Sequence, residues 1–376
     1  MSKTHKEEQL GKINVSELRE MLNKKAGRIV AYNLKDDENP TEVKDWVSTG
    51  STVLDAITCR GKWGGIPCSG RISLLEGLEG TGKSYLAAQI AGNAQKAGFT
   101  VFYFDAENAI DPEFLGKAGC DLNTLLYIPA ESIEFVLETI EESIGQVKNK
   151  CFFIVDSIAM CPCKTDIAGT FDPLESMALK ARILSKGMSK LIQPLATSES
   201  ALLLLNQLKT NLTCPNPKYA VETEKYASSG GKSIVYAASL RIFLTLRTAK
   251  ESYVTDSRGY RIGSEVKAKI VKSRFGTFGR EASFKIIWAD PEKIGVLENE
   301  SILEAVQPFL TQNGAWYSLD GQKFQRSGWD ELMKDENFKK KVMNIVEQEI
   351  IVKFDKRLGN ADEFYNAVKE KEPGSS

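Results

Sequence analysis

The chain has 376 residues, of which 42% are hydrophobic and 26% charged, and its formal net charge at pH 7 is −1. This length and composition predict a globular protein with one large core and one or two smaller modules. The near-neutral charge means that any nucleic-acid contact must come from a local basic patch. No apolar run reaches the roughly 18 residues of a membrane span, and the polar start predicts no signal peptide and no membrane partner.

Cysteine and histidine usage narrows the chemistry further. Seven irregularly spaced cysteines favour a reducing, cytoplasmic setting over a disulfide framework. Cys161 and Cys163 are separated by one proline, which is too close for the usual zinc pattern, and we expect ordinary buried or loop thiols. The only histidine, His5, lies in the expected frayed terminus, so proton abstraction must use a carboxylate.

The first 47 residues are predicted to form an arm that is separate from the core. Val15–Ala26 has the pattern of a helix, with Ser16 as N-cap and Gly27 as its stop. A charged loop then leads to Trp46.

Residues 48–290 alternate strands with helices, which predicts an α/β core: a mainly parallel twisted sheet with helices on both faces. The expected strands are Arg71–Leu75, Thr100–Asp105, Leu125–Ile128, Cys151–Asp156, Ala201–Asn206, Ser239–Arg247, Gly263–Lys272 and Glu281–Trp288. Two stretches, 161–175 and 208–231, lack apolar periodicity and are expected to be functional or disordered loops. Residues 291–368 predict a smaller, mostly helical C-terminal unit, and 369–376 a flexible tail.

The sequence GLEGTGKS, Gly77–Ser84, matches G-x-x-x-x-G-K-[ST], the P-loop, between an apolar strand and a helix. Its backbone N–H groups and the helix N-terminus are expected to hold phosphate oxygens, with Lys83 on the β- and γ-phosphates and Ser84 on Mg²⁺. A glycine turn before an ordinary core helix is the alternative. The predicted nucleotide-binding residues here are Gly77, Leu78, Glu79, Gly80, Thr81, Gly82, Lys83, Ser84 and Tyr85.

Polar side chains follow three apolar strands of the predicted sheet. Asp156 ends a continuous apolar run, where a carboxylate could hold Mg²⁺; a turn aspartate is the alternative. Glu107 falls just past the strand that ends at Asp105 and is our candidate base for the attacking water, although a helix-capping carboxylate fits the pattern equally well. Gln207 could hydrogen-bond a γ-phosphate and couple nucleotide state to loop order, or be a polar strand end without that role.

The stretch 208–231 interleaves cations with aromatic rings. Cations neutralise phosphates and aromatic faces stack on bases, so the pattern suits single-stranded nucleic acid. Glu222 and Glu224 weaken this case, and a solvated surface loop is an equally good interpretation. The candidate contacts are Lys209, Lys218, Tyr219, Lys225 and Tyr226.

Taken in order, these motifs resemble the RecA-type homologous recombinases of bacteria and phages over nearly the whole chain. The matching stretches are STGSTVLDAI, GLEGTGKS, FDAENAIDPEFL, FIVDSIA, LLLNQ, SSGGKSIVYAASLRI, KIVKSRFG and NGAWYSLDGQKF. DAENAIDP together with NGAWYS is the most specific combination. The resemblance implies a RecA-like P-loop ATPase core with an N-terminal polymerisation helix and a small α+β C-terminal domain.

The resemblance also implies a function. It implies DNA-stimulated hydrolysis of ATP with Mg²⁺, a helical filament on single-stranded DNA, and strand exchange with homologous double-stranded DNA. Single-strand-binding and mediator proteins would be further partners. A ring-forming helicase or branch-migration ATPase, and a mediator without useful turnover, are the alternatives.

Site residues carry over one by one. The resemblance implies adenine contacts from Asp111 and Phe114, and two cations, Lys272 and Arg274, that reach the γ-phosphate of the neighbouring subunit. The catalytic set is then Glu107, Lys83, Gln207, Lys272 and Arg274, with Ser84 and Asp156 on the metal. Residues 161–175 match the first DNA-binding loop, and further DNA-binding positions are Arg182, Gly230 and Gly231.

Some residues depart from the bacterial pattern. Ser189 stands where bacterial members usually carry an arginine, and Lys272 with Arg274 replaces two lysines, as in phage recombinases. The long acidic tail of many bacterial members is missing. These differences favour a phage or divergent member.

Overall fold

The computed structural model describes residues 14–35, 41–168, 173–211, 214–216, 220, 222–247, 249–290 and 294–353. The chain divides into two compact units, residues 1–43 and 44–376. The boundaries that we expected near residues 47, 290 and 368 stay predictions, and the expected tail at 369–376 lies outside the described residues. In the described part, no helix is both long enough and apolar enough to cross a membrane.

The described residues of the first unit contain one helix, α1, over Val15–Ala26, with the bounds that the sequence predicts. Its N-cap is Asn14, so the prediction of Ser16 was wrong. The Asn14 side chain accepts from the Glu17 N–H at 2.8 Å, and the Glu17 carboxylate accepts from the Asn14 N–H at 3.1 Å. Because this reciprocal pair needs a glutamate three residues after the cap, Asn14 satisfies it and Ser16 does not. Gly27 ends the helix with φ 65°.

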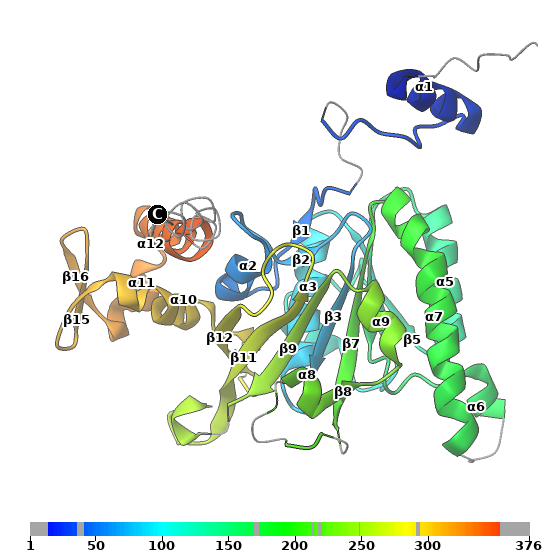
Figure 1. The fold of residues 1–376 in the computed structure, drawn as a ribbon. Helices are drawn as coiled ribbons and strands as arrows, with labels where there is room; N and C mark the ends of the chain where they lie inside the picture. Colours follow the sequence, from blue (N-terminus) through cyan, green and yellow to red (C-terminus); the bar gives the residue numbers. More distant parts are fainter. Residues whose placement is uncertain are drawn as a thin grey trace, which may run out of the picture. The chain divides into compact units, whose positions relative to one another are not determined.

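In the described residues, the second unit is built on an eleven-stranded mixed sheet (Figure 1). Its strand order is β13-β12-β11-β9-β3-β7-β6-β4-β5, with β10 beside β11 and β8 beside β7. The path from β9 to β5 is parallel, while the β9, β11, β12 and β13 neighbours pair antiparallel. This confirms the predicted mainly parallel α/β core. The strands are β3 Ile72–Gly77, β4 Thr100–Asp105, β5 Leu126–Pro129, β6 Cys151–Asp156, β7 Ala201–Thr210, β8 Tyr226–Ser228, β9 Leu240–Leu246, β10 Tyr253–Thr255, β11 Arg261–Ser273, β12 Glu281–Ile287 and β13 Gly295–Val296.

Helices cover both faces of this sheet. α3 (Lys83–Lys96) packs on one face, while α5 (Ile133–Gln146) and α7 (Pro173–Thr197) lie alongside each other on the opposite face (Figure 1). The sequence of β6 is continuously apolar because both faces of the strand are buried. Phe152 packs in the core on the α3 side and Phe153 in the core on the α5–α7 side. The shorter elements are β1 Trp46–Val47, α2 Thr52–Thr58, β2 Ile66–Pro67, α4 Pro112–Lys117, α6 Lys164–Ala168, α8 Glu222–Lys225, α9 Lys232–Ala237 and η1 Lys250–Ser252.

Both expected loops contain regular structure. β7 does not end at Asn206 but runs to Thr210, and it pairs antiparallel with β8. The stretch 208–231 therefore begins in one strand of this pair and contains the other strand near its end. The strand continues because Leu208 is buried against Phe243 and Val271, partners that are distant in sequence. In the stretch 161–175, α6 and the start of α7 replace part of the expected loop. Cys161 and Cys163 are buried free thiols, as predicted.

The described C-terminal residues are mostly helical, as predicted, and they also form a three-stranded antiparallel sheet. The α+β description implied by the resemblance is therefore confirmed. The motif NGAWYSLDGQKF forms its central hairpin. Trp329, Phe324 and Phe338 pack their rings together in its core. The elements are α10 Glu298–Val306, η2 Gln307–Phe309, β14 Thr311–Asn313, β15 Trp316–Leu319, β16 Gln322–Gln325, η3 Arg326–Gly328, α11 Trp329–Leu332, α12 Glu336–Ile345 and η4 Val346–Val352.

Candidate nucleotide and catalytic site

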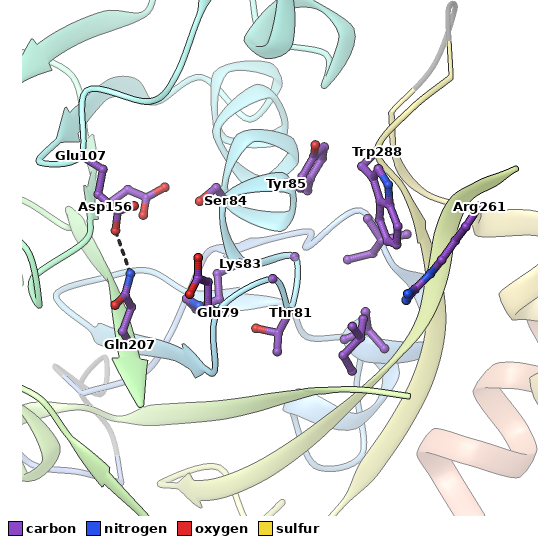
Figure 2. Close-up of a pocket in the computed structure, with 15 residues that line it drawn as sticks. Glu79, Thr81, Lys83, Ser84, Tyr85, Glu107, Asp156, Gln207, Arg261 and Trp288 are labelled. Atoms are coloured by element: carbon purple, nitrogen blue, oxygen red, sulfur yellow. Dashed lines mark hydrogen bonds between the residues drawn. The ribbon is translucent and has the colours of Figure 1, made fainter. Parts of the chain in front are cut away.

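A cavity of about 420 Å³ lies beside the turn from β3 to α3 (Figure 2). It brings together the predicted residues Glu79–Tyr85, Glu107, Asp156 and Gln207. The first three follow or end β3, β4 and β6, while Gln207 lies within β7, in register with Gly77 at the end of β3. Gly77 and Leu78 precede the lining residues in the same turn. The residues that line the cavity are Glu79, Gly80, Thr81, Gly82, Lys83, Ser84, Tyr85, Glu107, Asp156, Gln207, Leu246, Arg261, Val266, Ile286 and Trp288.

The turn has the backbone of an anion cradle. Gly82 caps α3 with φ 83°, and a Cβ there would lie 2.6 Å from Ile286 Cδ1, so only glycine fits. Lys83 is buried and donates to the carbonyls of Leu78 at 2.9 Å and Gly77 at 3.2 Å. Burial lowers the pKa of Lys83 below its ordinary value. A dehydrated lysine beside helix N–H groups favours an anion as its partner.

Asp156, at the end of β6, is 5% exposed and lies next to the turn. Burial raises its pKa to about 6, although the hydroxyls of Ser84 and Tyr103 both donate to its carboxylate. Ser84 and Asp156 are hard oxygen ligands, which suits Mg²⁺. Within the described ranges, no three His, Cys, Asp or Glu side chains gather to hold a metal alone.

Glu107 lies opposite Gln207, and Figure 2 draws the hydrogen bond between them. The Gln207 amide donates to Glu107 Oε1 at 3.1 Å, and the Ser157 hydroxyl donates to the same oxygen at 2.8 Å. Asp105 holds the backbone of this segment by accepting from the Glu107 N–H at 2.9 Å. The predicted base and the predicted phosphate sensor are therefore in direct contact. Sequence reasoning missed Ser157, although it directly follows Asp156.

The opposite end of the cavity has an aromatic and apolar wall that sequence reasoning missed. Leu246, Val266 and Ile286 come from β9, β11 and β12, and Trp288 and Arg261 stand at the rim. The Arg261 guanidinium lies 3.8 Å from the Tyr253 ring centre and 5.2 Å from that of Trp288. The antiparallel pairings of β11 with β9, β10 and β12 bring these residues together, and a single sequence gives no direct signal for those pairings.

The two predicted adenine contacts lie outside the cavity lining as described. Asp111 is the N-cap of α4, and its carboxylate accepts from the Phe114 N–H at 2.7 Å. Phe114 packs edge-on against Tyr85, with ring centres 5.0 Å apart. Because Tyr85 does line the cavity, Phe114 supports its wall from behind. Direct contact of Asp111 or Phe114 with a base stays a prediction.

Lys272 and Arg274 are also absent from the described lining of the cavity. The Lys272 ammonium donates to the carbonyls of Val235 at 2.6 Å and Tyr236 at 2.9 Å, near the C-terminal end of α9. Burial lowers the pKa of Lys272, and the positive charges of the neighbouring Arg274 and Arg241 lower it further. Arg274 is exposed. The carbonyls of α9 therefore hold the Lys272 ammonium in this chain.

The predicted DNA-binding residues converge only in part. A Cβ at Gly230 would lie 2.8 Å from Leu184 Cδ1, and one at Gly231 3.0 Å from Ala181 Cβ, so the end of the 208–231 stretch packs on α7 beside the exposed Arg182.

The other predicted DNA contacts are more scattered. Lys209 is exposed at the end of β7, and Lys225 is half-buried. Tyr226 is partly buried against a small apolar cluster. Lys218 and Tyr219 lie outside the described residues.

Behind the P-loop lies a buried polar cluster centred on Glu76, the residue before Gly77. Glu76 is fully buried and accepts from Arg241 Nε at 2.9 Å and Nη2 at 2.7 Å. It also accepts from the Ser228 hydroxyl at 2.5 Å and the Asn206 amide at 3.3 Å. The start of the P-loop is thus tied to the neighbour of Gln207 and to the end of the 208–231 stretch.

Comparison with known sequences agrees with this architecture. The family model of the RecA N-terminal domain matches residues 14–292. The protein RecA of Laribacter hongkongensis is 31% identical over 292 residues, which cover 76% of each chain. RecA of Pseudomonas fluorescens is 31% identical over 74% of each chain, and RecA of Mannheimia haemolytica is 32% identical over 74% of this chain and 70% of its own.

Proposed function

The chain belongs to the RecA family and is a RecA-type recombinase, and from this premise we propose that it couples ATP hydrolysis in the cavity to strand exchange. The general activity of the family is homologous strand exchange by a filament on single-stranded DNA. The observation that carries the proposal for this chain is the contact of Glu107 with Gln207 beside the P-loop. This hydrogen bond links the proposed general base, Glu107, to Gln207, which directly precedes the 208–231 stretch that we propose to bind DNA.

In this proposal, each polar residue has a separate task. The N–H groups of the turn and Lys83 bind the phosphates, and Glu107, held by Ser157 and Gln207, orients water and accepts its proton. Ser84 and Asp156 would hold Mg²⁺, which when bound neutralises charge on the transferred phosphoryl group. A γ-phosphate would compete with Glu107 for the Gln207 amide, and release of that amide would reposition the strand that leads into the 208–231 stretch.

We further propose that Lys272 and Arg274 complete the site of a neighbouring copy. Their absence from the described lining of the chain's own cavity supports this arrangement. An arm with an apolar face also supports self-association, because the described helix α1 buries no residue and exposes Val15, Leu18, Met21 and Leu22. An arm that docks on the next copy builds an open filament.

A mixing experiment tests this division of the site. Lys83→Ala removes the phosphate ligand and Arg274→Ala the trans cation, so each variant alone should lack DNA-stimulated hydrolysis. In a random equimolar filament, about a quarter of the interfaces would combine an intact P-loop with an intact cation, and activity should return to that fraction. Lack of recovery, with both variants shown to enter mixed filaments, would contradict a site shared between copies.

DNA binding gives a second test. Lys83→Ala should abolish the increase in single-stranded DNA affinity that ATP causes, because no phosphate can then reorganise Gln207. Fluorescence anisotropy with a labelled oligonucleotide measures this DNA affinity.

Electron micrographs of the chain with DNA test the type of assembly. Rings in place of filaments would favour a helicase-like function. A cytoplasmic location and mediator partners stay predictions.

A further inference from the structure

We propose that Ser228, held by the buried pair of Glu76 and Arg241, is a positioning residue that links the nucleotide site to the end of the 208–231 stretch. The inference deepens the proposed function, because it rests on phosphate binding at Lys83 and on DNA binding by that stretch. It gives a role to a polar cluster that the proposed mechanism does not use. In the described part of the chain, no member of this cluster lines the nucleotide cavity.

The centre of the cluster lies where the P-loop begins. Glu76 directly precedes Gly77 at the end of β3 and is fully buried. The Ser228 hydroxyl, at the end of β8, donates to Glu76 Oε1 at 2.5 Å and accepts from Arg241 Nη2 at 3.1 Å. It therefore contacts both members of the ion pair. Hydrogen bonds to ionised groups are about twice as strong as neutral ones, so this contact fixes the last residue of β8 against the start of the P-loop.

Two adjacent residues of β7 connect the cluster to the catalytic end of the cavity. Gln207 donates to Glu107 at 3.1 Å. Asn206 donates to Glu76 at 3.3 Å and to the Ser229 carbonyl at 3.0 Å. Successive side chains of a strand point to opposite faces of the sheet, so the two amides hold β7 from both sides. The Ser229 hydroxyl also donates to the Gln207 carbonyl at 3.3 Å, and a shift of Gln207 toward a γ-phosphate must therefore act on the end of the 208–231 stretch.

One acceptor of the cluster is unsatisfied. Among the described residues, Asn206 Oδ1 is buried and has no hydrogen-bond donor. A buried acceptor without a partner raises the free energy of the arrangement that contains it. A shift of β7 that brings a donor to this oxygen would recover that free energy, so a second arrangement of the cluster is accessible. Coupling between two sites requires such an element with two arrangements, which both sites can bias.

Reciprocal binding titrations test the proposal, with a labelled single-stranded oligonucleotide and the non-hydrolysed analogue AMP-PNP with Mg²⁺. The coupling factor is the ratio of the oligonucleotide Kd without and with AMP-PNP, and linkage requires the same ratio for the Kd of AMP-PNP without and with the oligonucleotide. Ser228→Ala removes the hydroxyl and keeps the ion pair. It should lower the coupling factor about 5-fold, the equivalent of one net hydrogen bond, and leave the Kd of AMP-PNP without DNA unchanged. A merely structural serine would not change this ratio.

Two further variants complete the test. Ser228→Thr keeps a hydroxyl, and its β-branched side chain suits a strand, so it should retain the parental coupling factor. Ser301→Ala is the matched control, because Ser301 is 2% exposed and its hydroxyl donates to the Leu297 carbonyl at 2.7 Å and accepts from the Lys285 N–H at 3.4 Å. Urea denaturation checks that each variant is folded.

Full coupling in Ser228→Ala, or an equal loss of coupling in Ser301→Ala, would overturn the proposal. So would a higher Kd of AMP-PNP without DNA in Ser228→Ala, because the hydroxyl would then act on the nucleotide site alone. Failure of the proposed function is recognised separately, since the parent itself would then show no coupling between nucleotide and DNA.

Discussion

The two ends of the cavity are built on different principles. At the polar end, Glu107 and Asp156 come from the ends of buried parallel strands and Gln207 from within the neighbouring strand β7, and hydrogen bonds fix their side chains. At the aromatic end, Trp288 and Arg261 come from antiparallel strands and meet through stacked rings and charge. Chemistry needs donors and acceptors in fixed directions, whereas a base needs a flat apolar surface. We therefore expect substitutions at the polar end to have larger effects than those at the aromatic end.

The largest effect should come from Glu107→Gln. Loss of a positioned general base costs about 10²- to 10⁴-fold in kcat, while the amide keeps the size and the Ser157 contact, so ATP binding should persist. Phosphate release on single-stranded DNA measures turnover, and nucleotide titration measures binding. Glu113→Gln in α4 is the control, because that side chain is 76% exposed. If Glu107→Gln hydrolysed ATP at the parental rate, Glu107 would not be the general base.

The buried support of the polar end should be the next most sensitive. Arg241→Met leaves the carboxylate of Glu76 buried without its cation, and we expect unfolding free energy to fall by about 3–5 kcal/mol. Arg247→Met is the matched control, because its guanidinium is 50% exposed and 3.6 Å from Glu265; that loss should be at most about 1 kcal/mol. Urea denaturation compares the two, and equal losses would contradict a structural role for the buried pair.

Asp55 can be compared with Glu76, because both are buried carboxylates. Asp55 accepts hydrogen bonds from hydroxyls, whereas Glu76 is paired with an arginine. Burial raises its pKa to about 7, although Ser48 and Thr49 donate to it at 2.6 and 2.7 Å. The folded state therefore holds this proton more tightly than the unfolded state. As pH rises from about 4 to about 7, the unfolding free energy should fall, by on the order of 4 kcal/mol from this group.

Asp55→Asn removes that contribution. Parent and variant should thus differ in the slope of unfolding free energy against pH over this range, with the flatter profile in the variant. Parallel profiles would show that burial does not control this carboxylate.

The smallest effect should come from Arg261→Ala at the aromatic end. A cation–π contact at an exposed site is worth about 0.5–1 kcal/mol, so the Kd of ATP should rise only about 2- to 5-fold. Nucleotide titration of the variant and of Arg258→Ala, another exposed arginine near an aromatic ring, measures this. A loss of several hundred-fold would mean that Arg261 binds phosphate and that the two ends are not distinct.

The sequence could predict the polar end because parallel strands bury both faces. Such strands have continuous apolar sequences, and the polar residues that follow these apolar runs, such as Asp156 and Gln207, can be expected at one edge of the sheet without knowledge of strand order. It could not predict the aromatic end, since Trp288 meets Arg261 only through the β11–β12 register. The same limit hid the β7–β8 hairpin, whose short second strand has no periodicity of its own.

Helix caps and buried side-chain contacts also differ in how far the sequence alone predicts them. The bounds of α1 followed from its pattern, but the choice of Asn14 over Ser16 depended on a reciprocal pair with Glu17. The support of Glu107 by Ser157, and of Glu76 by Arg241, depends on neighbours in the sheet and has no sequence spacing to reveal it.

The coupling of ATP hydrolysis to recombination is measured by strand exchange between a circular single strand and its homologous linear duplex. With ATP and Mg²⁺, the chain should convert the pair to nicked circular duplex and displaced strand, and Lys83→Ala should form none. Filament formation with DNA-stimulated ATP hydrolysis but no exchanged product would contradict the account, as would exchange at the parental rate by Lys83→Ala.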